Sequence, residues 1–183
     1  MTYPMLLAHD ARTAAILEGM NERVPGMPRD LPDMMRDLAF RRTLVHSQTA
    51  LALISTHPDE PAPDMASLAR HAIARCRDGA KDPEGELSSV PAGTTAEELL
   101  AIYRQGLAVM LEGANECRPP VIEDFADILS HARIRNRYLG PVAALCVVAR
   151  CGGLSSSTIA RFARDAALDA EACPKDGYGD EAT

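Results

Sequence analysis

Apolar residues recur along the chain at intervals of three and four residues, the spacing that places them on one face of a helix. This pattern predicts amphipathic helices within residues 5–23, 31–55, 64–76 and 95–114, and proline or glycine follows each segment closely. Alanine, leucine, arginine and methionine are frequent and β-branched residues are few, which also favours helix over strand. The sequence therefore predicts an all-α protein, a multi-helix bundle.

The same pattern divides the chain into two helical regions. Residues 1–76 form the N-terminal region and residues 95–172 the C-terminal region, which starts with the capping-box pair Thr95 and Glu98. Residues 77–94 between them have no helical period and are rich in glycine, proline and charge, so we predict a flexible loop there. Residues 173–183 form an acidic tail that we expect to be disordered.

The segment 31–55 is apolar on two sides. One stripe consists of Leu38, Val45 and Ala52, and a second stripe consists of Phe40, Leu44, Leu51 and Ile54. Such a helix must be covered on both sides, so it lies either at the centre of the bundle or against another subunit. We predict a homodimer or a protein partner through this helix, because a second stripe left in water would be an exposed apolar patch.

One C-terminal segment combines the signals for a helix, a turn and a second helix. We expect the first helix to open at Gly140-Pro141 and to end at Gly152-Gly153, with Gly153 in the left-handed conformation. Leu154 should fill the space between the two helices, and Ser155 should cap the second one. The sequence therefore predicts a helix-turn-helix-like hairpin at the C-terminal end of the bundle.

In the second of these helices, Ile159 and Phe162 face the interior, and Ser156, Ser157 and Arg161 face the other way. Residues 145–164 resemble the helix-turn-helix of LacI-type DNA-binding proteins, and the resemblance implies a DNA-binding element. In that family the motif opens the chain and precedes a sugar-binding domain, whereas here it lies near the C-terminus and Gly152 replaces a small apolar residue. The alternative is an αα-hairpin that serves packing, with no contact to DNA.

Charge is distributed in a way that suits a phosphate-binding surface. The chain has a net charge of −7, yet no acidic residue lies between Asp127 and Asp165, a segment that contains six arginines. We predict that Arg161, Ser156 and Ser157 contact bases. Arg150 and Arg164 are predicted to contact flanking phosphates. Arginine far outnumbers lysine throughout the chain, however, which is also typical of a GC-rich bacterial genome.

A second resemblance concerns the N-terminal helix. His9-Asp10-Ala11-Arg12-Thr13 is similar to the H-box of histidine-kinase dimerisation domains, which implies a phospho-accepting role for His9. Ala14 follows where that family usually has proline, and the chain contains no glycine-rich nucleotide-binding motif. The other interpretation is an exposed histidine near a helix start, and we predict no phosphotransfer at His9.

The remaining chemistry-bearing residues show no functional spacing. The five cysteines form no CxxC pair, and no stretch is long and apolar enough to cross a membrane. Glu123, Asp127 and His131 recur at i, i+4 and i+8, but no second helix offers matching ligands, so we assign no metal and no cofactor. No nucleotide-binding or nucleophile motif is present. We therefore predict a cytoplasmic protein that is not an enzyme and has no catalytic residue.

Three functional hypotheses follow from the sequence. The first is a DNA-binding or nucleoprotein-complex protein that uses the C-terminal helix-turn-helix. The second is an all-helical protein interaction module, or a small subunit of a larger assembly, without nucleic-acid contact. The third is a histidine phosphotransfer protein that uses His9.

Overall fold

The computed structural model describes residues 4–22, 38–76, 90–116 and 132–172. All regular secondary structure in these ranges is helical, which confirms the predicted all-α multi-helix bundle. The helices are α1 (Pro4–Glu22), α3 (Leu38–Thr56), α4 (Ala62–Cys76), α5 (Ala96–Glu116), α7 (Ala132–Val148) and α8 (Ser156–Glu171). None of them is long and apolar enough to span a bilayer.

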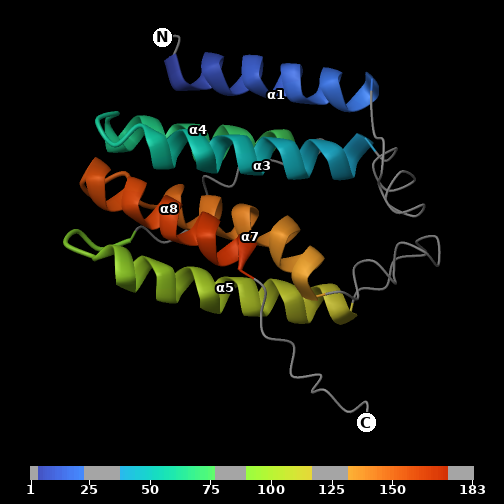
Figure 1. Ribbon diagram of the computed structural model, residues 1–183. Helices are drawn as coiled ribbons and strands as arrows, with labels where there is room; N and C mark the ends of the chain where they lie inside the picture. The colour runs from blue at the N-terminus through green and yellow to red at the C-terminus, as the bar shows by residue number, and fades with distance from the viewer. Residues whose placement is uncertain (1–3, 23–37, 77–89, 117–131, 173–183) are drawn as a thin grey trace.

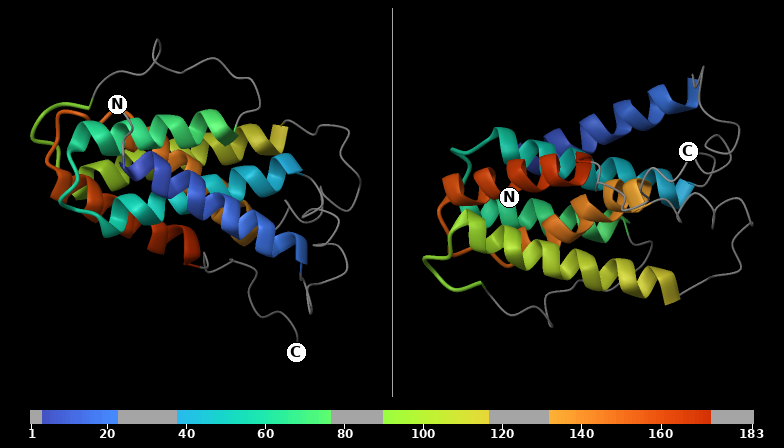
Figure 2. Two further views of the ribbon diagram at one scale, coloured as in Figure 1. Left: turned by 90° about the horizontal axis from the view of Figure 1, so that it is seen from above. Right: turned by 60° about the horizontal axis from the view of Figure 1, so that its bottom comes forward.

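The helices pack in layers, which Figures 1 and 2 show from three sides. The outer helix α1 lies on α3 and α4, which in turn lie on α7 and α8, and α5 covers the opposite side. One hydrophobic core contains buried residues from all six helices. The N-terminal and C-terminal helical regions therefore share a single core.

The helix α3 lies at the centre of this arrangement, where it contacts α1, α4, α7 and α8. Within the described residues of its two apolar stripes, Leu51 and Ile54 are buried and Leu44 is half-buried. The side chain of Phe40 and the predicted helix start at residue 31 lie outside what the structure describes. Because the bundle itself covers most of both stripes within the described part of α3, these residues do not require a second subunit.

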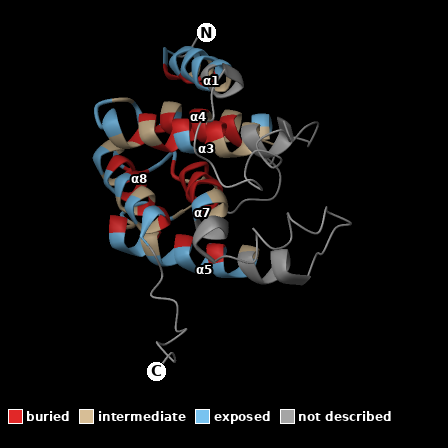
Figure 3. Cartoon of the chain, turned by 45° about the vertical axis from the view of Figure 1, so that its right-hand side comes forward, coloured by how far each residue is buried: buried red, intermediate tan, exposed pale blue. Residues whose placement is uncertain are grey.

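The apolar spacing predicts a buried apolar face on the other helices. The structure has such a face on α4 and α5, but on α1 only in part. In α4 the residues Met65, Leu68 and Ile73 are buried. In the described part of α1 the buried residues are Met5, His9 and Thr13, whereas the apolar residue Ile16 is exposed. Figure 3 shows most of α1 exposed, with its few buried residues on the side of α3 and α4. The buried face of α1 is narrow and partly polar, so the spacing of apolar residues does not predict which side of this helix is buried.

The helix α7 begins at Ala132 and continues through Gly140-Pro141, so the prediction that this dipeptide opens the helix is wrong. A proline costs a helix one backbone hydrogen bond, and packing on both sides must offset that cost. Gly140 shows how close the packing is. A Cβ atom at this position would lie 2.8 Å from Cβ of Ala170 in α8 and 3.1 Å from the hydroxyl of Tyr103 in α5.

The turn between α7 and α8 confirms part of the predicted hairpin. The Ser155 hydroxyl accepts a hydrogen bond from the Thr158 backbone N–H at 3.3 Å and caps α8, and Leu154 is buried between the helices. The left-handed conformation expected for Gly153 is wrong, because Gly93 is the one described glycine with positive φ. The helix instead ends at Val148, and hydrogen bonds between residues three positions apart tighten its last turn. One of them runs from the Arg150 N–H to the Val147 carbonyl, and the chain turns without a left-handed residue.

Candidate functional site: a histidine cluster

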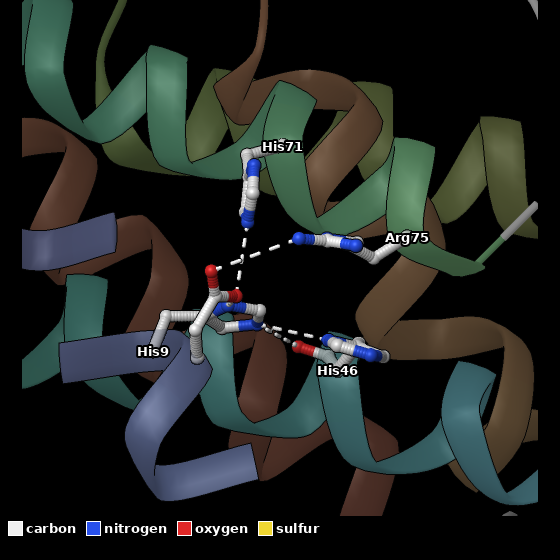
Figure 4. A network of polar contacts seen from close by, with 5 residues as sticks. His9, His46, His71 and Arg75 are labelled. Atoms are coloured by element: carbon white, nitrogen blue, oxygen red, sulfur yellow. Dashed lines mark hydrogen bonds and ion pairs between the residues drawn. The ribbon is translucent and has the colours of Figure 1, made fainter. Parts of the chain in front are cut away.

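Three helices bring polar side chains together on one side of the bundle (Figure 4). His9 and Asp10 come from α1, His46 comes from α3, and His71 and Arg75 come from α4. The residues are far apart in the sequence, and the packing of α1 on α3 and α4 makes them neighbours. We call this group the histidine cluster.

The carboxylate of Asp10 lies in the middle of the cluster. Its Oδ1 atom is 3.0 Å from Nδ1 of His9 and 3.0 Å from Nε2 of His71. Its Oδ2 atom is 3.9 Å from Nη2 of Arg75. The ligand atoms of His9, Asp10 and His71 all lie within 4.8 Å of one another, a grouping that can hold a metal ion.

The other nitrogen of His9 faces α3. Its Nε2 atom is 3.2 Å from the backbone carbonyl oxygen of His46 and 3.4 Å from Nδ1 of the His46 ring. The two rings lie against each other with centroids 5.1 Å apart. The His9 side chain is 0% exposed, so both of its nitrogens are fixed by protein groups.

Burial and hydrogen bonding set the protonation of the cluster. Burial lowers the pKa of His9, although its contacts with Asp10 and the His46 carbonyl work in the other direction. Burial and the neighbouring His9 lower the pKa of His46 to about 4. Burial raises the pKa of Asp10, but hydrogen bonds from His71 and His9 outweigh it, and the net shift is downward. At neutral pH the cluster therefore presents the Asp10 carboxylate and neutral imidazoles at His9 and His46, and carboxylates and neutral imidazoles are the forms that bind metal ions.

The cluster has a closed inner side and an open outer side. His9 and His46 are buried and form the inner side. The side chains of Asp10, His71 and Arg75 are 42%, 27% and 59% exposed, respectively. A small ligand from solvent can therefore reach the carboxylate and the His71 ring.

The residues predicted to contact DNA lie elsewhere in the fold, on α8 and the turn before it. Ser157, Arg161 and Arg164 are exposed, and Ser156 is half-buried. Arg150 is also half-buried, and its Nε atom is enclosed without a hydrogen-bond partner. None of these residues belongs to the histidine cluster.

The exposed arginines of α8 have protein partners. The guanidinium of Arg161 is paired with the Glu97 carboxylate of α5, and its Nε atom is 3.9 Å from Asp165. Arg164 donates to the backbone carbonyl of Ser55 at 3.4 Å. The acidic partners offset part of the positive charge that the sequence assigned to this surface.

Sequence reasoning did not find the cluster. The sequence predicts an exposed His9 unless this residue accepts a phosphoryl group, but His9 is buried. It lies one helical turn from Met5 and from Thr13, on the inner face of α1. His46 of α3 is also buried, although no sequence pattern marks it. The i, i+4 spacing of Met5, His9 and Thr13 is the one local signal of this burial. The predicted carboxylate and histidine row of Glu123, Asp127 and His131 lies outside the described residues.

Comparison of the chain with protein-family models, curated proteins and solved structures found no match.

Proposed function

We propose that this protein binds a divalent transition-metal ion, with Nδ1 of His9, a carboxylate oxygen of Asp10 and Nε2 of His71 as ligands. The observation that carries the proposal is the position of the His9 ring between two oxygen acceptors. These acceptors are Asp10 Oδ1 at 3.0 Å and the His46 carbonyl at 3.2 Å.

A neutral imidazole has one N–H group, so it can donate to one of these two oxygens and not to both. The doubly protonated ring could donate to both, but burial lowers the pKa of His9 and disfavours that form. A metal ion removes the conflict. The Nδ1 lone pair then binds the ion, and Nε2–H donates to the backbone carbonyl, which is the usual arrangement of metal-bound histidines.

The ligand atoms lie close together but are not yet at the separations of a tetrahedral metal site. Tetrahedral bonds of about 2.0–2.2 Å place neighbouring ligand atoms roughly 3.4 Å apart. The present separations from Asp10 Oδ1 to His9 Nδ1 and to His71 Nε2 are both 3.0 Å. All three ligand atoms lie within 4.8 Å of one another, so the partly exposed Asp10 and His71 side chains would have to rotate to surround an ion.

The ligand set indicates the type of ion and of site. Two imidazole nitrogens and one carboxylate suit zinc or another late first-row metal rather than calcium or magnesium. Three protein ligands leave at least one position for solvent or a small molecule, as in zinc sites that are not purely structural. The open outer side of the cluster gives access to that position.

Cobalt(II) titration of metal-stripped protein tests the proposal. We expect visible absorption of bound Co²⁺ that Zn²⁺ displaces, and His71→Ala should weaken binding at least tenfold. His71 is half-exposed, so its loss leaves no large core cavity. His57→Ala is the matched control, because His57 is an exposed histidine outside the cluster. Equal Co²⁺ binding by the wild type and His71→Ala, or no binding by the wild type, would show that the cluster is not a metal site.

DNA binding by α8 is a second candidate. It is favoured by the exposure of Ser157, Arg161 and Arg164 on a helix that Ser155 caps. Phosphates would have to compete with Glu97 and Asp165 for Arg161, so this candidate has the weaker support. The second hypothesis from the sequence, an interaction module, needs no such competition.

A gel-shift titration over a salt series distinguishes these alternatives. If α8 binds DNA, Arg161→Ala should weaken binding and remove preference for the cognate site, and Arg164→Ala should weaken binding to all sequences alike. Glu97→Gln should strengthen binding, because it frees Arg161. Absence of any shift for the wild type and for Glu97→Gln at low salt would exclude DNA binding by α8.

A further inference from the structure

Arg75 is a cation at the open side of the histidine cluster, and Asp10 is only a distant ion-pair partner for it. It follows His71 by one turn of α4, and its Nη2 atom is 3.9 Å from Asp10 Oδ2. That distance exceeds the 2.7–3.2 Å typical of a hydrogen bond. An exposed ion pair of this length contributes little to stability, so the guanidinium can exchange Asp10 for another anion at little cost.

Metal binding would change the charge of the cluster. In the metal-free protein the negative charge of Asp10 faces the positive charge of Arg75. A divalent ion bound to Asp10 leaves two uncompensated positive charges at the cluster. The buried rings of His9 and His46 close the inner side, so this excess charge faces solvent beside Asp10, His71 and Arg75.

We propose that the loaded site takes a small oxyanion, one oxygen on the metal ion and another on the Arg75 guanidinium. This inference rests on the metal site proposed above. Carboxylates and phosphates share the required chemistry, since both carry a negative charge over oxygens on one centre. The planar guanidinium matches such oxygens with parallel N–H donors. The ion binds the oxyanion at the position that the three protein ligands leave open.

The visible spectrum of the Co²⁺-loaded protein provides the test. Titration with inorganic phosphate and, separately, with acetate should change the bands of the bound ion with a saturable dependence. A response to phosphate alone identifies a phosphate site, and a response to acetate alone identifies a carboxylate site. Either response supports the proposal.

Arg75→Gln separates this inference from metal binding. The variant should bind Co²⁺ at least as tightly as the wild type, because a positive charge near the ion is gone, and its anion affinity should fall at least tenfold. Arg75→Lys should keep part of that affinity. Arg104→Gln is the matched control, because Arg104 is a similarly exposed arginine of α5 that pairs with Asp169.

Two outcomes would overturn the inference while the metal site stands. One is a Co²⁺ spectrum that neither anion changes. The other is an anion response of Arg75→Gln equal to that of the wild type. Failure of the wild type to bind Co²⁺ is a different result, since it would refute the proposed function itself.

Discussion

Tyr103 is a fully buried side chain whose hydroxyl has no hydrogen-bond partner among the described residues. Its ring packs edge-on against Phe162, with centroids 6.2 Å apart. We expect Tyr103→Phe to keep this packing and to leave the free energy of unfolding at pH 7 unchanged or higher by about 1 kcal/mol, because an unpaired buried hydroxyl is removed. Urea unfolding measures this. A loss of more than about 1 kcal/mol would mean that the hydroxyl is favourably bonded.

The same residue gives the protein a stability change at high pH. Burial and the nearby Asp169 raise the pKa of Tyr103 to about 12, from an ordinary value of 10.0. Between these values the unfolded chain has lost the phenol proton and the folded chain keeps it, so stability falls as pH rises from 10 to about 12. Unfolding curves over this range should show a smaller decline for Tyr103→Phe. An identical decline in both proteins would contradict the assignment.

At the scale of single helices, the cap of α8 can be tested directly. Ser155→Ala removes the acceptor of the Thr158 N–H and should lower the free energy of unfolding by about 1 kcal/mol. Ser157→Ala is the control, because Ser157 is exposed and its hydroxyl contacts the Ser155 hydroxyl rather than a backbone N–H. It should stay within about 0.5 kcal/mol of the wild type. Equal losses in both variants would argue against the cap.

Two glycines within helices should respond to alanine in opposite directions. In α5, a Cβ atom at Gly106 meets nothing within 4 Å, so Gly106→Ala should stabilise the protein by about 0.5–1 kcal/mol through helix propensity. In α7, a Cβ atom at Gly140 meets Ala170 at 2.8 Å, so Gly140→Ala should destabilise by roughly 1–3 kcal/mol. Thermal unfolding of both variants compares them. Stabilisation by Gly140→Ala would show that α7 and α8 can separate without cost.

At the scale of the whole molecule, metal binding should stabilise the packing of the outer helix α1 on the rest of the bundle. The helix α1 packs mainly on α3 and α4, and two of its buried residues, His9 and Thr13, are polar. Hydrogen exchange in metal-free protein should therefore be faster in α1 than in the central α3. An ion held by His9 and Asp10 of α1 and by His71 of α4 links the two helices.

Zinc at about 100 times its dissociation constant should raise the free energy of unfolding by about 2.7 kcal/mol. The gain in exchange protection should be largest in α1. In His71→Ala both effects should be clearly smaller at the same zinc concentration. Zinc stabilisation that leaves α1 exchange unchanged would place the ion elsewhere in the protein.

The helices of this fold could be predicted from the sequence, because the interactions that favour a helix and its caps are local. Apolar residues three and four positions apart predicted the helices, and short-range pairs predicted the capping by Ser155 and by Thr95 with Glu98. Each signal depends on residues within one turn, so it needs no knowledge of the rest of the chain. At Gly140-Pro141, where contacts with α5 and α8 intervene, the local rule failed.

The candidate site was decided by tertiary structure. His9, His46 and His71 lie 25 or more positions apart, on three helices, and no spacing rule relates them. They meet because α1 packs across α3 and α4 with Met5, His9 and Thr13 inward. Burial then keeps two of the imidazoles neutral, and the His46 carbonyl orients the His9 ring. The sequence by itself determined which segments are helical, whereas the packing of those helices determined which polar side chains share one environment.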